Sequence, residues 1–550
     1  MPKDSWPVRP LTDLSTSRTL LSNLRNTGAF MDTSKIKIII VGILSVFVAL
    51  YLGISVATAQ IETVAWMLGS AVLITCIALG RKVWLLIPFM SALAIGLRIP
   101  GQPDTGLLGQ ILVIGFSIPL FLLRRLPYRF AFRELEFWLL VLTLFVAQAY
   151  MRNPVGVNVF GGDTVGGKAY VVYAIYLVGG LLLGGLTVPV SELKWLLRLS
   201  ILGGLMNLVV SIVGNLFPAI GYWTGGAYDQ SEGFDNDSAI DAKDATRIGY
   251  LGTFSKNSAL WISSFVSPLR ACFRPLWAVL MLVTLVAAAM SGFRNSIIST
   301  GFILFFGICY RSGFFGMMVA VIGMVGGLAG LAVINVIHPL PPNIQRSLTF
   351  LPGTWEQRYS ADAENSNTWR LEIWKEVLLT NRWIENKWLG DGLGFKASEL
   401  AAQTTAREGA RMGISGFEAH REAILSNGDY HSGPVQTIRT IGYIGLLFLV
   451  LAQVRLAVHA HRQIQRCRNT EWFPLALLVG IPLVLAPIIF VLVFGTFKDT
   501  SASLFLSYGM IRLLENNLPL PVYVKRTRIP FIPQTVNNDW APDVKRDAIN

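Results

Sequence analysis

Hydrophobic residues gather in long runs, and short polar segments separate these runs along most of the chain. A helix needs about 20 apolar residues to cross roughly 30 Å of hydrocarbon. By that measure, fourteen candidate spans begin near positions 37, 61, 83, 106, 135, 169, 195, 251, 275, 295, 313, 440, 472 and 500. The runs that begin at 83, 251, 295 and 500 are the shortest, so the pattern predicts an all-α polytopic membrane protein with 12–14 transmembrane helices.

The composition supports this fold class. Hydrophobic residues make up 53% of the chain and charged residues only 14%, whereas a soluble domain carries about 25% charge. The four cysteines are scattered and form no CxxC pair, so neither a disulfide framework nor a zinc site is indicated. The polar first 35 residues lack the apolar core of a signal peptide, so the run near position 37 is expected to remain as a span.

Positive charges assign the two sides of the membrane. Lys and Arg accumulate in cytoplasmic loops, and a cytoplasmic N-terminus places fourteen of them in short inner loops and five in short outer loops. The inner ones are Arg81, Lys82, Arg124, Arg125, Arg129, Arg133, Lys194, Arg198, Arg270, Arg274, Arg311, Arg462, Arg466 and Arg468. This bias also accounts for the net charge of +13 without nucleic acid. We expect a multi-pass membrane protein with both termini cytoplasmic.

This topology divides the chain into five parts. A cytoplasmic segment covers 1–36, eleven helices with an acidic outer loop at 218–256 cover 37–337, and a large periplasmic loop covers 338–438. Three further helices lie in 439–515, and a Pro-containing cytoplasmic tail covers 516–550. A loop as long as 338–438 is usually functional rather than a simple connection.

The large loop contains five tryptophans interleaved with basic residues. In the stretch TWRLEIWKEVLL, helical spacing places Trp369, Ile373 and Trp374 on one face. Such a helix can lie at the bilayer interface, where Trp is enriched. Its rings can also stack on sugars while arginine binds phosphate, and both interpretations stay open.

Two further residues are candidates for chemistry. Arg294, in SGFRNS, stands at the outer junction of two spans, against the charge bias, and either snorkels or serves a site. His431, in GDYHSGP, is where the large loop re-enters the membrane. A histidine there is either a structural hydrogen-bonding residue or a general base, since its pKa lies near neutrality. The chain has no Walker loop and no HExxH motif, and its Asp235-Asn-Asp237 sequence is a weak signal, so metal-free chemistry is favoured.

The order of these motifs resembles the bacterial O-antigen ligase and polymerase family of integral-membrane glycosyltransferases, across about residues 245–450. The matching stretches are TRIGYLGTFSKNSALW, SGFRNS, NTWRLEIWKEVL, WLGDGLGF and YHSGPVQTIRTIGYIGLL. They carry Arg247, Asn257, Arg294, Arg370, Trp374, Gly390, Gly392, Gly394, His431, Gly442 and Gly445. The chain departs from the family pattern at Ser432, where Asn is common, and at Thr440, where an acid is common.

The resemblance implies a GT-C-type architecture and transfer of a glycan from an undecaprenyl-diphosphate carrier to an acceptor hydroxyl on the periplasmic face, in polysaccharide biosynthesis of the cell envelope. Catalysis would fall to His431, Arg294 and Arg370, with no cofactor and no metal. Substrate binding would involve Arg247, Asn257, Trp369, Trp374, Gly392 and Gly394. The partners would be the lipid-linked donor, a glycan, lipid or protein acceptor, the bilayer and other polysaccharide-export proteins.

Three functions remain open on this basis. The number of predicted spans slightly favours a polymerase over a ligase. The first alternative is a small-solute transporter or channel, although transporters keep ionisable groups near the midplane, where these spans have few. The second is a protein O-oligosaccharyltransferase.

Overall fold

The fold was analysed in a computed structural model. It describes residues 61–98, 102–155, 166–224, 247–394, 421, 425, 428, 430–492 and 495–519. Throughout these residues the regular structure is helical, and β-pairing is limited to the isolated bridges Gly96–Asp104 and Tyr128–Leu186. The predicted all-α class is therefore confirmed.

Eight helices within the described part of the chain are long and apolar enough to cross a membrane. They are Gly69–Leu93, Thr105–Leu122, Glu134–Arg152, Lys168–Gly185, Val190–Leu216, Arg294–Ile337, Gly433–Cys467 and Phe473–Leu492. Large apolar side chains on the surface, such as Leu282 and Val325, fit contact with lipid tails. The chain is thus a multi-pass helical membrane protein by helix length and hydropathy.

The predicted count of fourteen spans is not reached by this criterion. The span predicted near position 37 lies outside the described residues. Helix α12 (Pro275–Met290) is apolar but has only 16 residues, and α10 (Gly249–Phe265) has 17. Helix α20 (Phe497–Asn517) begins near the predicted position 500 but carries Lys498, Asp499, Arg512 and Glu515.

Two compact units make up the chain, residues 1–80 and 81–550. The described part of the first is α3 (Ile61–Leu79). The second begins in the 3-10 helix η1 (Gly80–Leu85) and continues through α4 (Leu86–Leu93). Asp104 accepts a hydrogen bond from the Leu107 amide and so caps the next helix, α5.

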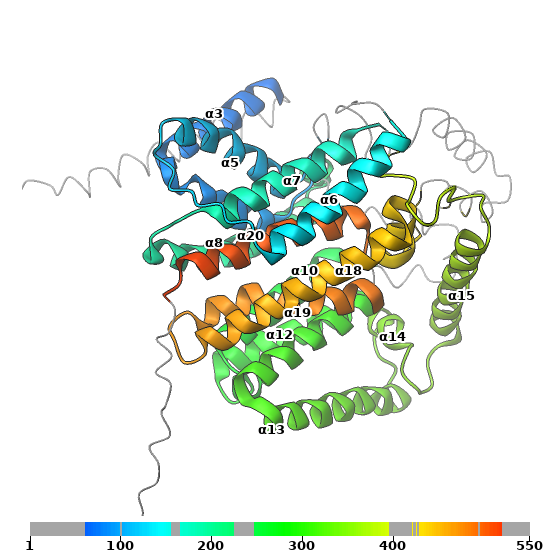
Figure 1. The fold of residues 1–550 in the computed structure, drawn as a ribbon. Coiled ribbons are helices and arrows are strands. Elements are labelled where there is room, and N and C mark those ends of the chain that lie inside the picture. The colour runs from blue at the N-terminus through cyan, green and yellow to red at the C-terminus, as the bar shows by residue number, and fades with distance from the viewer. Residues whose placement is uncertain are drawn as a thin grey trace, which may run out of the picture. The chain divides into compact units, whose positions relative to one another are not determined.

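The membrane-spanning part of the second unit consists of helices that lie side by side (Figure 1). Helix α7 packs against α5 and α20, α18 packs against α6, α19 and α20, and α10 packs against α8, α12, α13 and α19. The bounds not yet given are α5 (Thr105–Leu122), α6 (Glu134–Arg152), α7 (Lys168–Gly185), α8 (Val190–Leu216), α9 (Pro218–Trp223), α11 (Pro268–Ala271), α13 (Arg294–Ile337), α18 (Gly433–Cys467) and α19 (Phe473–Leu492).

Glycines allow α7 and α20 to approach closely. A Cβ added at Gly180 would collide with the Phe505 carbonyl of α20, and one at Gly184 would lie 3.1 Å from the Arg512 side chain. Small residues at a helix contact bring backbones together in a membrane, where packing rather than hydrophobicity drives association. The glycines of LVGGLLLGGL therefore explain why the last described helix is inserted deep in the fold.

A buried ion pair joins α6 to α20. Arg512 donates to both oxygens of Glu136, from Nε at 2.8 Å and from Nη2 at 2.8 Å, and Tyr508 donates to the same carboxylate at 2.7 Å. The side chains of Arg512 and Glu136 are each only 4% exposed. A charge buried in this way requires its partner, because removing one partner leaves the other desolvated and uncompensated.

Helix α13 contains a break at Gly313, whose φ of 66° and ψ of −156° are not helical. This break lies where the sequence predicts one span to end and the next to begin. Outside the spans, the large loop contains α14 (Pro342–Leu348) and α15 (Gln357–Leu379). The helix predicted in TWRLEIWKEVLL is present and begins earlier than expected.

We expect Arg512→Leu to lower the stability of the protein strongly, by about 3–5 kcal/mol, because it leaves Glu136 buried without its cation. The double variant Glu136→Leu/Arg512→Leu should recover a large part of that loss. The measurement is the melting temperature of the detergent-purified protein, with the exposed Arg125→Leu as the control. Equal melting temperatures for Arg512→Leu and the control would contradict a structural role for the pair.

Candidate functional site

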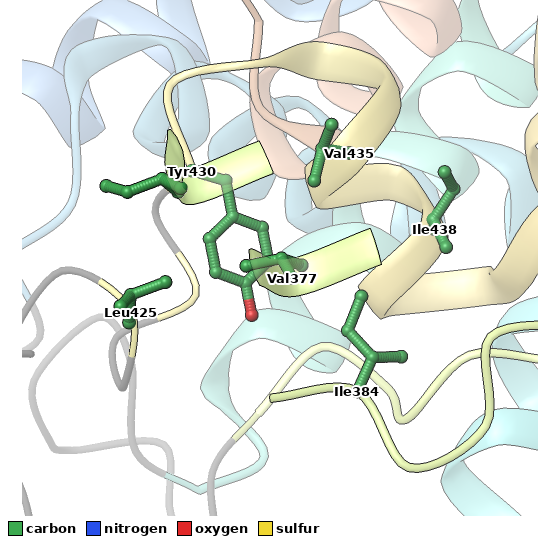
Figure 2. Packing of buried hydrophobic residues seen from close by; sticks show 7 residues of the cluster. Val377, Ile384, Leu425, Tyr430, Val435 and Ile438 are labelled. Carbon is green, nitrogen blue, oxygen red and sulfur yellow. The ribbon is translucent and has the colours of Figure 1, made fainter. Parts of the chain in front are cut away.

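Helix α15 packs one apolar face against the segment that re-enters the membrane (Figure 2). Ile373 and Val377 of this face are buried, and Trp369 and Trp374 pack against the same cluster. The other buried members are Ile384, Leu425, Tyr430, Val435 and Ile438. The predicted common face of Trp369, Ile373 and Trp374 is confirmed, and it is an internal packing face of the loop.

His431 lies in a tight turn directly before α18. Its φ of 49° is in the left-handed region, which residues other than glycine rarely adopt. The indole Nε1 of Trp374 donates to the Tyr430 carbonyl at 2.8 Å, and the Trp369 and His431 rings lie 5.6 Å apart. Both tryptophans therefore hold the turn that presents the imidazole.

Arg370 is on the same side of α15 as this turn. It follows Trp369 directly and precedes Trp374 by four residues, a spacing that places two side chains on one helix face. Arg370 is half-buried. The structure thus brings Arg370, Trp369, Trp374 and His431 together on two packed elements.

Helix α18 is broken at Gly442, where φ is 76° and ψ is 177°. The Gly-rich turn WLGDGLG forms hydrogen bonds with the backbone at this break. The carbonyls of Arg439 and Thr440 accept from the amides of Asp391 and Gly392, at 2.6 and 3.0 Å. In return, the amide of Tyr443 donates to the Lys387 carbonyl at 2.8 Å. Buried backbone groups must find partners, and here the loop supplies those that the broken helix loses.

Glycine is required at both sides of this contact. A Cβ at Gly442 would collide with the Trp388 carbonyl, and one at Gly390 would collide with the backbone of Thr440 and Ile441. Both residues have positive φ, of 76° and 77°. Steric contact and positive φ therefore explain why this chain has glycine at positions 390 and 442.

Gly392 and Gly394 also make close backbone contacts. A Cβ at Gly392 would collide with the Tyr170 hydroxyl, and one at Gly394 would lie 2.5 Å from the Gly166 carbonyl. The same turn is bound by α6, because Gln148 donates to the Leu389 carbonyl at 2.7 Å. These contacts attach the large loop to the ends of α6 and α7, and substrate binding by Gly392 and Gly394 stays a prediction.

Arg439 was not singled out from the sequence. It is 9% exposed, and the Gly428 backbone lies so close that a Cβ there would approach the guanidinium to 3.1 Å. Burial raises the pKa of Tyr430 to about 12, although the charge of nearby Arg439 acts in the opposite direction. The position of Arg439 in the apolar run TIRTIGYIG marks it in the sequence as a candidate site residue, because ionisable residues in such runs are often functional.

Arg247 and Arg294 meet at a second place, the junction of α10, α12 and α13. The Ile248 amide donates to the Ser291 carbonyl at 2.9 Å, and the Arg247 guanidinium lies 5.7 Å from the centre of the Phe293 ring. Gly292, with φ of 73°, forms the turn between the two helices. Arg247 is thereby placed beside the SGFRNS turn.

Asn257 lies farther along α10, about 12 Å from Gly249 at the usual rise per residue. It packs toward α8, where a Cβ at Gly204 would lie 3.3 Å from the Asn257 Nδ2 atom. This position belongs to a helix contact rather than to the group that contains Arg247. Its predicted substrate contact is not tested.

A second arginine absent from the prediction lies near the Arg294 turn. Helix α14 packs on the end of α12, where Ser347 donates to the Ala289 carbonyl at 3.2 Å. Arg346, the neighbour of Ser347, is 8% exposed. Nothing in the spacing of α14 sets Arg346 apart, so the sequence offered no signal for it.

The structure thus forms two groups, one with His431 and Arg370 and one with Arg247 and Arg294. The contacts given above hold each group together, and none of them links the two. Asp235 and Asp237 lie outside the described residues. No family model matches the chain, and no curated protein matches it.

We expect Gly442→Ala to destabilise the protein and loosen the turn at His431, because the added methyl group collides with the Trp388 carbonyl at a positive φ. Strained backbone of this kind costs about 1–3 kcal/mol. The matched control is Gly326→Ala, at a helical position of α13 with no atom within 4 Å of the new Cβ. The control should melt at or slightly above the wild-type temperature. A Gly442→Ala variant that melts above the Gly326→Ala control would contradict the close contact between Gly442 and the Trp388 carbonyl.

Proposed function

We propose that this multi-pass helical membrane protein transfers a glycan from a polyprenyl-diphosphate carrier to an acceptor hydroxyl on the periplasmic face. The main support is the packing of α15 against the turn before α18, which holds a half-buried arginine and an imidazole on the same pair of elements. The ordered motifs that resemble O-antigen ligases and polymerases give the second support. These two observations are independent, since the first is a contact in the structure and the second is the order of motifs along the sequence.

In the proposed reaction the acceptor oxygen attacks the anomeric carbon of the donor sugar. A new carbon–oxygen bond forms, and the bond from that carbon to the diphosphate oxygen breaks. The acceptor proton passes to His431, and the polyprenyl diphosphate leaves with the bonding electron pair. General base catalysis of this kind contributes about 10²–10⁴-fold.

The arginines would stabilise the diphosphate. A guanidinium presents a planar fork that binds phosphate oxygens bidentately and stays charged at any working pH. Arg370 lies on the helix that packs against the turn of His431, and Arg294 with Arg247 forms the second cationic group. A donor that extends over both groups would place its diphosphate between fixed charges, and such preorganisation is commonly the largest catalytic contribution.

Trp369 and Trp374 have a positioning role in this proposal. Both pack on the internal cluster, and Trp374 also binds the Tyr430 carbonyl. The exposed indole of Trp388 is better placed for the membrane interface, where amphipathic rings are favoured. Trp369 is half-buried, so the exposed part of its indole ring is the part that can stack on a sugar.

A transporter or channel remains the second candidate because α18 is broken at Gly442. Transporters build substrate sites from such discontinuous helices. The freed Arg439 and Thr440 carbonyls, however, are already bound by the Gly-rich turn, whereas a transporter would offer them to an ion. Solute uptake into sealed vesicles without glycan transfer would favour this candidate.

The acceptor could be a growing glycan, a lipid core or a protein. Loss of a polymerase leaves single repeat units on the lipid core, loss of a ligase leaves the core bare, and loss of a protein O-oligosaccharyltransferase removes glycan from proteins only. The surface polysaccharide of a deletion strain distinguishes the three on a gel.

Purified protein carrying His431→Ala, Arg370→Ala or Arg294→Ala should lose at least about 100-fold in glycan transfer, because each lacks the base or a diphosphate ligand. The measurement is transfer from a polyprenyl-diphosphate glycan in detergent or proteoliposomes. His338→Ala and Arg382→Ala are the matched controls, since both residues are exposed and lie in the same loop. Full activity in all three site variants, with unchanged melting temperatures, would end the proposal.

Labelling from each side of the membrane should place this site outside the cytoplasm. In a background in which the exposed Cys272 is replaced by Ser, Lys375→Cys on α15 should react with an impermeant maleimide added to intact spheroplasts. Arg466→Cys, in the predicted inner loop, should react only after the membrane is opened. The reverse pattern would remove the site from the face where it is proposed to act.

A further inference from the structure

A cavity of about 1130 Å³ lies at the opposite end of the helices from His431. Its walls come from the start of α6, the end of α7, the second half of α18 and the end of α20. The segment 128–131 closes one side. The charge bias of the sequence predicts that this end faces the cytoplasm.

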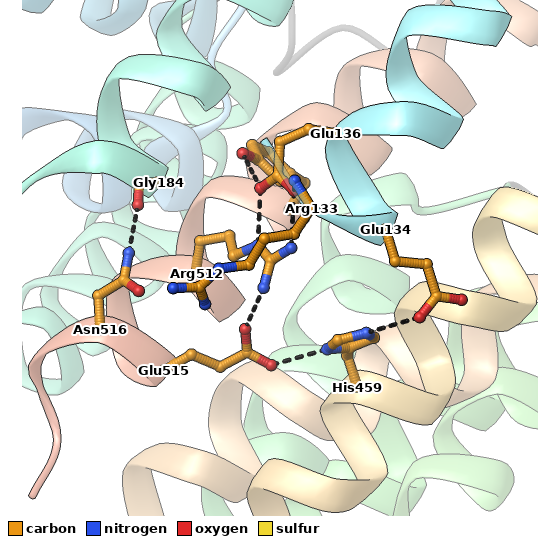
Figure 3. Close-up of polar contacts among 9 residues, drawn as sticks. Arg133, Glu134, Glu136, Gly184, His459, Arg512, Glu515 and Asn516 are labelled. Carbon is orange, nitrogen blue, oxygen red and sulfur yellow. Dashed lines mark hydrogen bonds and ion pairs between the residues drawn. The ribbon is translucent and has the colours of Figure 1, made fainter. Parts of the chain in front are cut away.

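One wall of the cavity is a chain of paired charges (Figure 3). Arg512, besides holding Glu136, donates from Nη1 to Glu515 at 2.6 Å. Glu515 is in turn 2.8 Å from the His459 Nδ1 atom. The positive charge of Arg512 is therefore already neutralised by two carboxylates, and this wall is fixed in place.

The His459 ring has a polar atom at this wall that forms no hydrogen bond. Its Nε2 is buried, has no hydrogen-bond partner among the described residues, and lies 3.8 Å from a Glu134 oxygen, the contact drawn in Figure 3. Buried polar atoms usually have a hydrogen-bond partner. A polar ligand in the cavity can supply it.

Four other arginines line the same space. They are Arg129 and Arg133 before and at the start of α6, and Arg462 and Arg466 on α18. None of the four takes part in an ion pair among the residues that the structure describes. The lining also holds Glu134, but that carboxylate is bound by Arg455 at 3.3 Å. The cavity therefore attracts anions.

Apolar surface adjoins this basic cavity. In the stretch Arg129-Phe-Ala-Phe-Arg133, Phe130 is 52% and Phe132 is 58% exposed. Exposed aromatic rings between arginines suit a ligand with a charged head and a hydrocarbon tail better than a fully hydrated anion. Basic pockets between transmembrane helices on the cytoplasmic side bind such headgroups.

We propose that this cavity binds the phosphate headgroup of an anionic phospholipid, with its acyl chains along the Phe130–Phe132 surface. Arg462 and Arg466 of α18 line the same cavity as Arg129 and Arg133, so a phosphate bound by both pairs would join α18 to the start of α6 at their inner ends. This site is separate from the proposed transfer site, and its existence does not depend on glycan transfer.

Lipid binding to the purified full-length protein tests the proposal. Native mass spectrometry in detergent measures occupancy during titration with phosphatidylglycerol or with phosphatidylcholine. The wild type should bind phosphatidylglycerol at least about tenfold more tightly than phosphatidylcholine, and Arg462→Gln/Arg466→Gln should lose most of this preference. The pair Arg129→Gln/Arg133→Gln, on another element, should have the same effect.

The control is Arg124→Gln/Arg125→Gln, which removes two exposed arginines from the same inner loop but outside the cavity. It should change the preference by less than about twofold. Equal loss in the control and the cavity variants would mean general attraction to charged lipid, and the site would be rejected. Complete displacement of the lipid by millimolar inorganic phosphate would assign the cavity to a soluble anion and overturn the lipid proposal.

Discussion

The exchange of hydrogen bonds between the WLGDGLG turn and the break in α18 determines how the large loop is held. A helix that ends at Gly442 would expose carbonyls in a region with little water, and such groups cost several kcal/mol in a bilayer. The amides of Asp391 and Gly392 satisfy them. The turn, α15 and the residues before α18 then form one packed body, and His431 is fixed relative to Arg370 because both belong to it.

The hydrophobic pattern predicts much of this architecture. Apolar runs predict helix starts near 135, 169, 275 and 472, within a few residues of the observed ones, because length and apolar content are local properties of the chain. The same logic predicts the face of α15, where Trp369, Ile373 and Trp374 recur at helical spacing.

What the sequence does not reveal depends on contacts between distant residues. Arg512 and Glu136 are 376 positions apart, and neither residue alone indicates a buried ion pair. Arg346 and Arg439 are buried by elements that only the tertiary structure brings beside them. Conversely, Gly390 and Gly442 belong to the motif order that resembles the ligase and polymerase family, yet the reason for glycine there is steric and appears only when the two backbones meet.

The separation of Glu136 from Arg512 has a consequence for biogenesis. A ribosome that has delivered α6 into the membrane must still synthesise most of the protein before the matching cation emerges. Until then, Glu136, in the first turn of α6, has water or lipid headgroups in place of its cation, because an unpaired carboxylate is unstable away from water. Helix α20 therefore completes the polar contacts of α6, and a chain that ends before it would leave Glu136 without its cation.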